Sequence, residues 1–178
     1  MKCHLCETKG CSKGDPCISF DSLELYQGED LRLLKTASDV EALYYCTLNR
    51  LEEIMEFSRR MGYKKLGIAF CIGFRGEAEM LGKILSEEFE VYSACCKVSA
   101  MKKDDIGAVR RPWIGEISCN PAEQARVLDS AGCQFNIVLG LCVGHDSLFY
   151  RHSKAPVTTF VVKDRVLGHN PVSVLYSQ

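Results

Sequence analysis

The sequence lacks the long apolar segments that membrane insertion and secretion require. No apolar run approaches 18 residues, so we expect no membrane-spanning helix. The N-terminal stretch MKCHLCETKG has no apolar core of the kind that a signal peptide carries. An excess of one charge sign is also missing, since the net charge is −1 at pH 7. We therefore expect a cytoplasmic protein, and neither a membrane nor nucleic acid as its partner.

Internal repeats and low-complexity segments are absent as well. The 178 residues suffice for one domain with a full core, or for one domain with a small appendage. Hydrophobic residues make up 47% of the chain and charged residues 25%, as in an ordinary globular protein.

Cysteine, in contrast, is abundant, with eleven in the chain. The cytosol keeps thiols reduced, so this number points to metal binding or thiol chemistry before it points to disulfides. The odd number also argues against a complete disulfide framework. An anaerobic host would tolerate many free thiols, so packing stays an alternative.

The hydrophobic pattern predicts a helical lead-in at 29–61, followed by alternating strands and helices. Ser38 and Glu41 fit a capping box within the lead-in, and Gly62 fits a helix stop. Short apolar strands alternate with amphipathic helices from Lys64 onward, which predicts an α/β fold: a Rossmann-like three-layer domain with a mostly parallel sheet. The expected strands are 64–71, 90–96, 115–119, 134–142 and 156–164, and the expected helices are 76–89, 120–132 and 145–153.

We expect two domains. A small Cys-rich metal-binding module occupies 1–20, and the α/β domain occupies 21–178 with its sheet core at 64–163. The stretch 97–114 is the longest irregular connection, which is typical of a lid, a binding loop or disorder.

The N-terminal cysteines have a spacing suited to one metal ion. Cys3, Cys6, Cys11 and Cys17 form C-x2-C-x4-C-x5-C. Four thiolates this close together can surround Zn²⁺ tetrahedrally and organise a module that has no core of its own. The spacing also resembles iron–sulfur runs, although those are tighter. The alternative is four free thiols on a flexible tail.

Further cysteines stand where predicted strands end. These are Cys71, Cys96, Cys119 and Cys142. The carboxyl ends of parallel strands share one edge of a sheet, where open α/β folds bind ligands. We therefore predict a cofactor site there, holding zinc or an iron–sulfur cluster. Each cysteine alone would more often be a small packing residue, and that is the role we expect for Cys46 and Cys133.

Two polar residues open the helix that follows Cys142. His145 and Asp146 are candidate catalytic residues, because an imidazole or carboxylate next to thiolates can move protons. Capping of the helix N-terminus is the alternative role, particularly for Asp146.

Several stretches resemble a prokaryotic family of unknown function labelled "uncharacterised metal-binding protein". The resemblance rests on the N-terminal cysteines and three motifs: CNP at Cys119–Pro121, GLCVGHD at Gly140–Asp146 and APVTT-VKDR-LGHNP at Ala155–Pro171. It implies metal binding by the N-terminal cysteines and brings no reaction with it.

We thus expect a metal-binding protein with two cysteine centres. The second centre would carry electrons or act on a sulfur-containing or anionic small molecule, with a small-molecule ligand or redox partner, and whether the protein is an enzyme stays open. A different hypothesis is a non-enzymatic binding module with structural zinc and packing cysteines. A third is metal-free thiol redox chemistry by Cys95 with Cys96, or by Cys119 with Cys142; adjacent cysteines bridge only with strained geometry.

Overall fold

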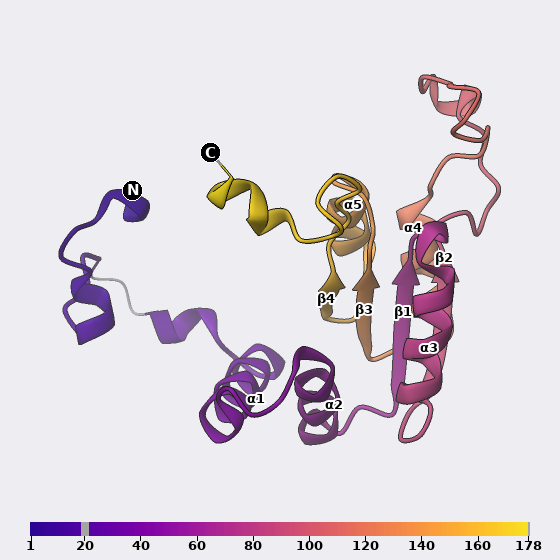
Figure 1. Ribbon diagram of the computed structural model, residues 1–178. Helices are drawn as coiled ribbons and strands as arrows, with labels where there is room; N and C mark the ends of the chain where they lie inside the picture. Colours follow the sequence, from indigo (N-terminus) through magenta and orange to yellow (C-terminus); the bar gives the residue numbers. More distant parts are fainter. Residues whose placement is uncertain (19–21, 178) are drawn as a thin grey trace.

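The protein has an α/β fold built on one parallel sheet. A computed structural model of the chain describes residues 1–18 and 22–177. Its four strands lie in the order β2-β1-β3-β4, and every neighbouring pair is parallel (Figure 1). Their bounds are β1 Lys65–Phe70, β2 Glu90–Cys95, β3 Phe135–Leu139 and β4 Val157–Val161. The predicted fold class is confirmed, and four of the five expected strands are present.

Helices account for most of the remaining regular structure. The α-helices are α1 Glu29–Tyr44, α2 Arg50–Met61, α3 Arg75–Leu85, α4 Pro121–Ser130 and α5 His145–His152. Short 3-10 helices are η1 Cys3–Leu5, η2 Gly10–Lys13, η3 Ser22–Leu25, η4 Ile72–Phe74, η5 Asp104–Ile106 and η6 Pro171–Tyr176. Within the part of the chain that the structure describes, none of the helices has the length and hydropathy needed to span a bilayer.

Alternation of side chains along the central strand β1 places helices on both faces of the sheet. Ile68 points toward α3, where a Cβ added at Gly82 would lie 4.0 Å from its Cδ1. The preceding residue, Gly67, faces the opposite way, and a Cβ there would lie 3.0 Å from Leu128 Cδ1 of α4. Successive residues of a strand face opposite sides of a sheet. The sheet is therefore the middle of three layers, as predicted.

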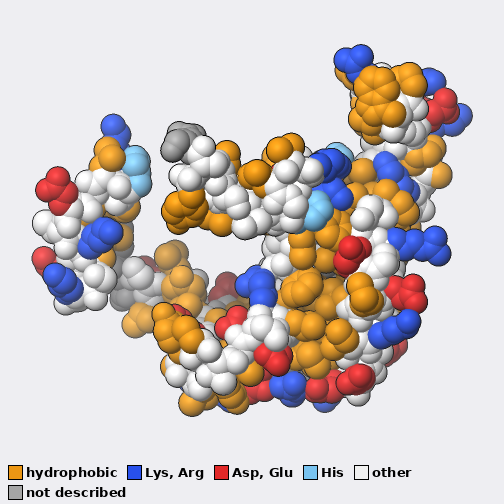
Figure 2. Space-filling model, viewed as in Figure 1, with side chains coloured by type: hydrophobic (Ala, Val, Ile, Leu, Met, Phe, Trp, Pro, Cys, Tyr) orange, Lys and Arg blue, Asp and Glu red, His pale blue; other side chains and the backbone are white. Residues whose placement is uncertain are grey.

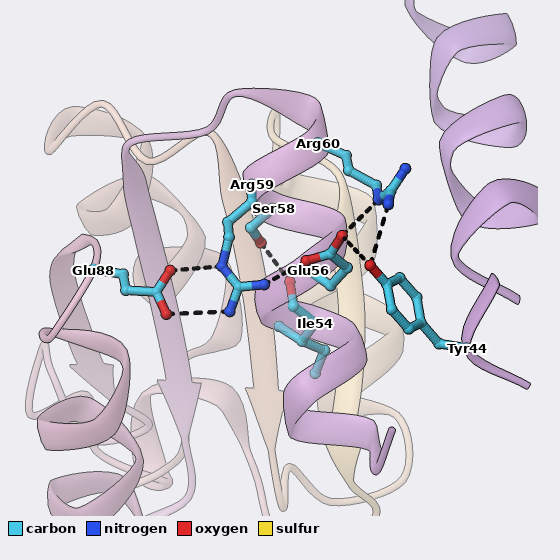
Figure 3. Close-up of polar contacts among 7 residues, drawn as sticks. All are labelled: Tyr44, Ile54, Glu56, Ser58, Arg59, Arg60 and Glu88. Atoms are coloured by element: carbon cyan, nitrogen blue, oxygen red, sulfur yellow. Dashed lines mark hydrogen bonds and ion pairs between the residues drawn. The ribbon is translucent and has the colours of Figure 1, made fainter. Parts of the chain in front are cut away.

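Polar contacts tie α2 to α1 and to the turn after α3 (Figure 3). Arg59 donates from Nε and Nη2 to both carboxylate oxygens of Glu88, at 2.6 and 3.1 Å, which ties α2 to the turn after α3. Glu56 accepts from Arg60 Nε at 2.7 Å and from the Tyr44 hydroxyl at 3.2 Å, which ties it to the end of α1. These groups are partly exposed, so they orient α2 more than they stabilise the fold.

The helical segment predicted at 29–61 consists of two helices, α1 and α2. The capping box predicted within it, at Ser38 and Glu41, is wrong. Ser38 lies inside α1, where its hydroxyl donates to the Leu34 carbonyl at 3.0 Å. A genuine capping box starts α2 instead: Asn49 accepts from the Glu52 backbone N–H, and Glu52 accepts from the Asn49 N–H. Ser38 and Glu41 have the residue types and spacing of a capping box, but the residues before Ser38 are already helical. The backbone N–H groups near Ser38 are therefore already hydrogen-bonded within the helix and need no cap.

The predicted strand at 115–119 is also wrong. This stretch makes one isolated antiparallel bridge, between Lys102 and Ile117, inside the long connection from β2 to α4. Figure 1 shows the connection projecting from the sheet. Gly115 and Glu116 are exposed, so the stretch has too little apolar surface to be buried as a strand.

Of the two cysteines expected to be buried packing residues, one is buried and one is exposed. Cys133 is buried, as predicted, and burial raises its thiol pKa to about 11. Cys46 is exposed and follows α1 with a φ of 57°, so the expectation that it packs is wrong. Helical periodicity suggested burial, but the helix ends before it.

The N-terminal residues contain turns and no core. Residues 1–18 hold only η1 and η2, neither of which has a buried residue, and they stand apart from the sheet in Figure 1. The predicted boundary at residues 20 and 21 lies outside the described residues. The metal-binding module at 1–20 stays a prediction.

Gly140 offers a test of the packing at the end of β3. Its φ is 65°, and a Cβ there would lie 2.1 Å from Phe74 Cε2. We expect Gly140→Ala to lower the free energy of unfolding by roughly 2 to 4 kcal/mol, because both backbone strain and overpacking act. Urea unfolding measures this change as a lower midpoint.

Gly76→Ala is the matched control. Gly76 lies in the first turn of α3 with nothing within 4 Å of an added Cβ. We expect its stability to stay the same or to rise by up to about 1 kcal/mol. Equal effects at the two positions would contradict the packing described here.

Candidate functional site

Parallel pairing brings the ends of β1, β2 and β3 into line. Phe70 is in register with Cys95 on one side and Leu139 on the other. The Cys96 N–H donates to the Phe70 carbonyl at 2.8 Å, and the Cys71 N–H donates to the Leu139 carbonyl at 3.1 Å. The cysteines that follow β1 and β2 therefore leave the sheet side by side, and Cys142 follows the end of β3.

Cys119 reaches the same edge from a loop. The Asn120 N–H donates to the Cys96 carbonyl at 2.9 Å, which anchors the loop end just before α4. Lys97 Nζ lies 3.4 Å from Cys119 Sγ and 2.7 Å from the Ile117 carbonyl oxygen. The prediction that Cys119 ends a strand is wrong, but its thiol still lies at the predicted edge.

The thiols form a row of neighbours across this edge. In order, the side chains that interact pairwise are Cys142, Cys71, Cys96, Cys119 and His145. Two of the thiols are buried and two are half-buried. Of the predicted edge residues, the structure thus brings together the four cysteines and the histidine, and we call these five residues the thiol row.

Charge is unevenly distributed at the Cys71 end of the row. Interaction with the Cys142 thiol, and then with Cys96, holds the pKa of Cys71 far below the ordinary thiol value. The pKa of Cys142 is raised, first by Cys71 and then by burial, although Arg165 Nη2 donates to its sulfur at 3.1 Å. The pKa values of these two neighbouring thiols are therefore shifted in opposite directions, and the interaction favours the thiolate form at Cys71.

The other end of the row repeats this arrangement. Interaction with Cys96, followed by His145, lowers the pKa of Cys119 to about 4, against an opposing contribution from burial. The pKa of Cys96 is raised, first by Cys119 and then by Cys71. Cys119 likewise raises the pKa of His145. The pairwise interactions thus shift the pKa values of neighbouring thiols in opposite directions along the row.

Three cations surround the row, and the sequence-based reasoning did not assign them to it. Lys97 and Arg165 donate to sulfurs, and the charge of Lys163 lowers the pKa of Cys71. Lys163 Nζ also lies 4.4 Å from the centroid of the Phe74 ring. A signal was available, because Lys163 and Arg165 lie shortly after the end of β4 at Val161 and so belong to the same edge.

Asp146 has a local partner. Its Oδ1 accepts from the Ser147 N–H at 2.7 Å, in the first turn of α5. Gly144, rather than Asp146, is the N-cap residue of that helix. The Asp146 backbone N–H donates to the Cys142 carbonyl at 3.1 Å, but within residues 1–18 and 22–177 its carboxylate has no hydrogen bond to the thiol row. Its predicted part in proton transfer stays a prediction, as does that of His145.

The donor chemistry of the row fits a thiophilic metal. Four sulfurs and an imidazole are ligands for zinc and for iron–sulfur clusters. The Ile72 N–H lies 3.3 Å from Cys96 Sγ, and such donors to sulfur are usual around thiolate-held metals. Among residues 1–18 and 22–177, however, no three His, Cys, Asp or Glu side chains are grouped closely enough to hold an ion as they stand. The row is an open series of pairs.

The N-terminal cysteines are only partly gathered. Cys11 Sγ and Cys17 Sγ are 3.9 Å apart, and Cys11 followed by Cys3 raises the pKa of Cys17. Cys6 instead lies 3.6 Å from the Thr8 hydroxyl, which lowers its pKa. All four thiols are exposed. Of the four predicted ligands, Cys11 and Cys17 thus lie together, and the four-cysteine site stays a prediction.

The chain has an archaeal relative of similar length. It is 48% identical over 184 residues to an uncharacterised protein, MJ0455, of Methanocaldococcus jannaschii, covering 100% of this chain and 95% of that protein. Two crystal structures of Dph2 from Pyrococcus horikoshii, one with a 4Fe-4S cluster, match 51% of this chain and only 22% of theirs. Their TM-score is 0.34 and their sequence identity 27%. A likeness of this extent does not bear on the fold, cofactor or activity of this protein.

A family model described as "Protein of unknown function (DUF1847)" matches residues 12–160, which include the whole thiol row. The predicted resemblance to a family of unknown function is thereby confirmed, while the metal-binding label stays a prediction. The chain belongs to the DUF1847 family.

Proposed function

We propose that this protein binds a metal ion or an iron–sulfur cluster through the thiols of Cys71, Cys96, Cys119 and Cys142. The observation that carries the proposal is the thiol row itself: four segments far apart in the sequence each deliver one thiol to the ligand-binding edge of the sheet. One buried cysteine is ordinary packing. Four that interact with one another at this edge are better explained by a shared ligand.

The charges around the row support the same proposal. Thiolates, not thiols, bind metals, and Cys71 and Cys119 have lowered pKa values. Lys97 and Arg165 donate to sulfurs and offset the negative charge that several thiolates would accumulate. When bound, a thiolate-held centre would carry electrons or polarise a small molecule. His145, beside Cys119, is the side chain best placed to hold a proton there.

A substitution at Cys71 tests the proposal. The protein is purified without oxygen, supplied with zinc or with iron and sulfide, and its bound metal, sulfide and visible absorption are measured. We expect Cys71→Ser and Cys119→Ser each to lose about one centre per chain, because each removes one of at most four sulfur ligands.

Cys133→Ser is the matched control, since Cys133 is a buried thiol outside the row. Its metal content should equal that of the unsubstituted protein. If Cys71→Ser also keeps its full metal content, the row is a packing arrangement, and the hypothesis of a binding module with packing cysteines takes its place.

We further propose that Cys3, Cys6, Cys11 and Cys17 hold a separate zinc ion. Support comes from their spacing and from the closeness of Cys11 to Cys17. Because η1 and η2 contain no buried residue, a bound ion would supply the stabilisation that this segment lacks. We expect Cys11→Ser to release about one zinc per chain and to speed proteolysis within residues 1–18.

Cys46→Ser serves as the control, because Cys46 is an equally exposed thiol outside both groups. It should change neither the zinc content nor the rate of proteolysis. The N-terminal site would be refuted if Cys11→Ser and Cys46→Ser gave the same zinc content.

A further inference from the structure

A pocket lies beside the start of the edge strand β4 and is lined mainly by residues of helices α1 and α2. Its volume is about 720 Å³, within the range of small-molecule sites. The apolar residues lining it come from the end of η3 and from α1, α2, β3 and β4, and the main ones are Leu33, Val40, Ile54, Phe57, Phe135 and Val157. We call it the α1–β4 pocket.

The pocket exists because α1 packs mainly on α2 and leaves part of its apolar side uncovered. Val40 and Thr36 are the only buried residues of α1, while Leu31, Leu34 and Leu43 are exposed. Figure 2 shows hydrophobic side chains on the surface over this helix. The side chains of β4 are only half-buried along its length. An apolar surface between them is therefore available to a ligand.

The charged residues that line the pocket are mostly acidic. Asp30, Glu41 and Glu53 are carboxylates, and none of them forms an ion pair within the described residues. The one cation in the lining, Arg50, is already engaged: it donates to the Thr159 carbonyl at 2.6 Å and to the Thr158 hydroxyl at 2.9 Å.

We propose that the α1–β4 pocket binds a small molecule with an apolar body and one positively charged amino group. The apolar lining takes the body, and the three unpaired carboxylates attract the amine. A second copy of this chain fits less well, because a two-fold interface uses the same surface of both copies and would bring two sets of these carboxylates together. The pocket lies away from the carboxyl edge of the sheet, so this proposal does not depend on metal binding.

Three ligands with the same eight-carbon chain test the charge preference. Calorimetric titration of the full chain with octylamine, octanol and octanoate compares a cation, a neutral molecule and an anion. We expect octylamine to bind roughly threefold to tenfold more tightly than octanol, and octanoate to bind more weakly than both. Equal binding of all three, or binding of none, overturns the proposal.

Substitutions test whether octylamine binds in the α1–β4 pocket. Ala37→Trp places a large ring in the pocket and should abolish octylamine binding. Glu53→Gln should weaken octylamine by about threefold to tenfold and leave octanol unchanged. Glu87→Gln, at an exposed position beyond α3, is the control and should change neither.

Light scattering of the same samples tests whether a second copy of this chain fills the pocket instead of a small molecule. The proposal expects a molecular mass that does not change with Ala37→Trp. A dimer that Ala37→Trp converts to a monomer would show that a second copy fills the pocket, and the proposal would then fail.

Discussion

The parallel alignment of β1, β2 and β3 is the constraint on which the candidate site depends. Because the strands run in one direction and end in register, the residues that follow them emerge at one edge. Hydrogen bonds from the Cys71 and Cys96 N–H groups continue the sheet pattern one residue beyond β1 and β2. Reversing one strand would send its cysteine to the opposite end of the molecule. The meeting of the thiols is thus a consequence of topology.

Once the thiols meet, their mutual interactions determine the chemistry. Four adjacent sulfurs cannot all be ionised in a half-buried site without compensation, so ionisation of one thiol opposes ionisation of its neighbours. Lys97, Lys163 and Arg165 then offset the remaining negative charge. The same row could serve as a set of ligands or as reactive thiols, and both uses need the lowered pKa of Cys71 and Cys119. The metal content of the purified protein distinguishes a row of metal ligands from a row of metal-free reactive thiols.

Most of the α/β domain could be predicted from local patterns. The helix expected at 120–132 starts at Pro121, with Asn120 as its N-cap, because capping depends on the residues at the helix end itself. The capping box at Ser38 was wrong because the same residue types also occur within helices. The strand predicted at 115–119 was wrong because a short stretch becomes a strand only when a neighbour pairs with it along its length, and this one makes a single bridge.

The sequence by itself determined where buried strands and amphipathic helices form, and which cysteines follow those strands, because these properties reside in neighbouring residues. Only the tertiary structure decided the strand order, the sequence of pairs along the thiol row and the cations beside it. Arg165 and Cys142 are 23 positions apart, and their contact exists only because β4 pairs with β3. The α1–β4 pocket could likewise not be predicted from the sequence, since it depends on how α1 packs against α2 beside the edge strand β4. Such contacts follow from packing between distant segments, which local periodicity does not specify.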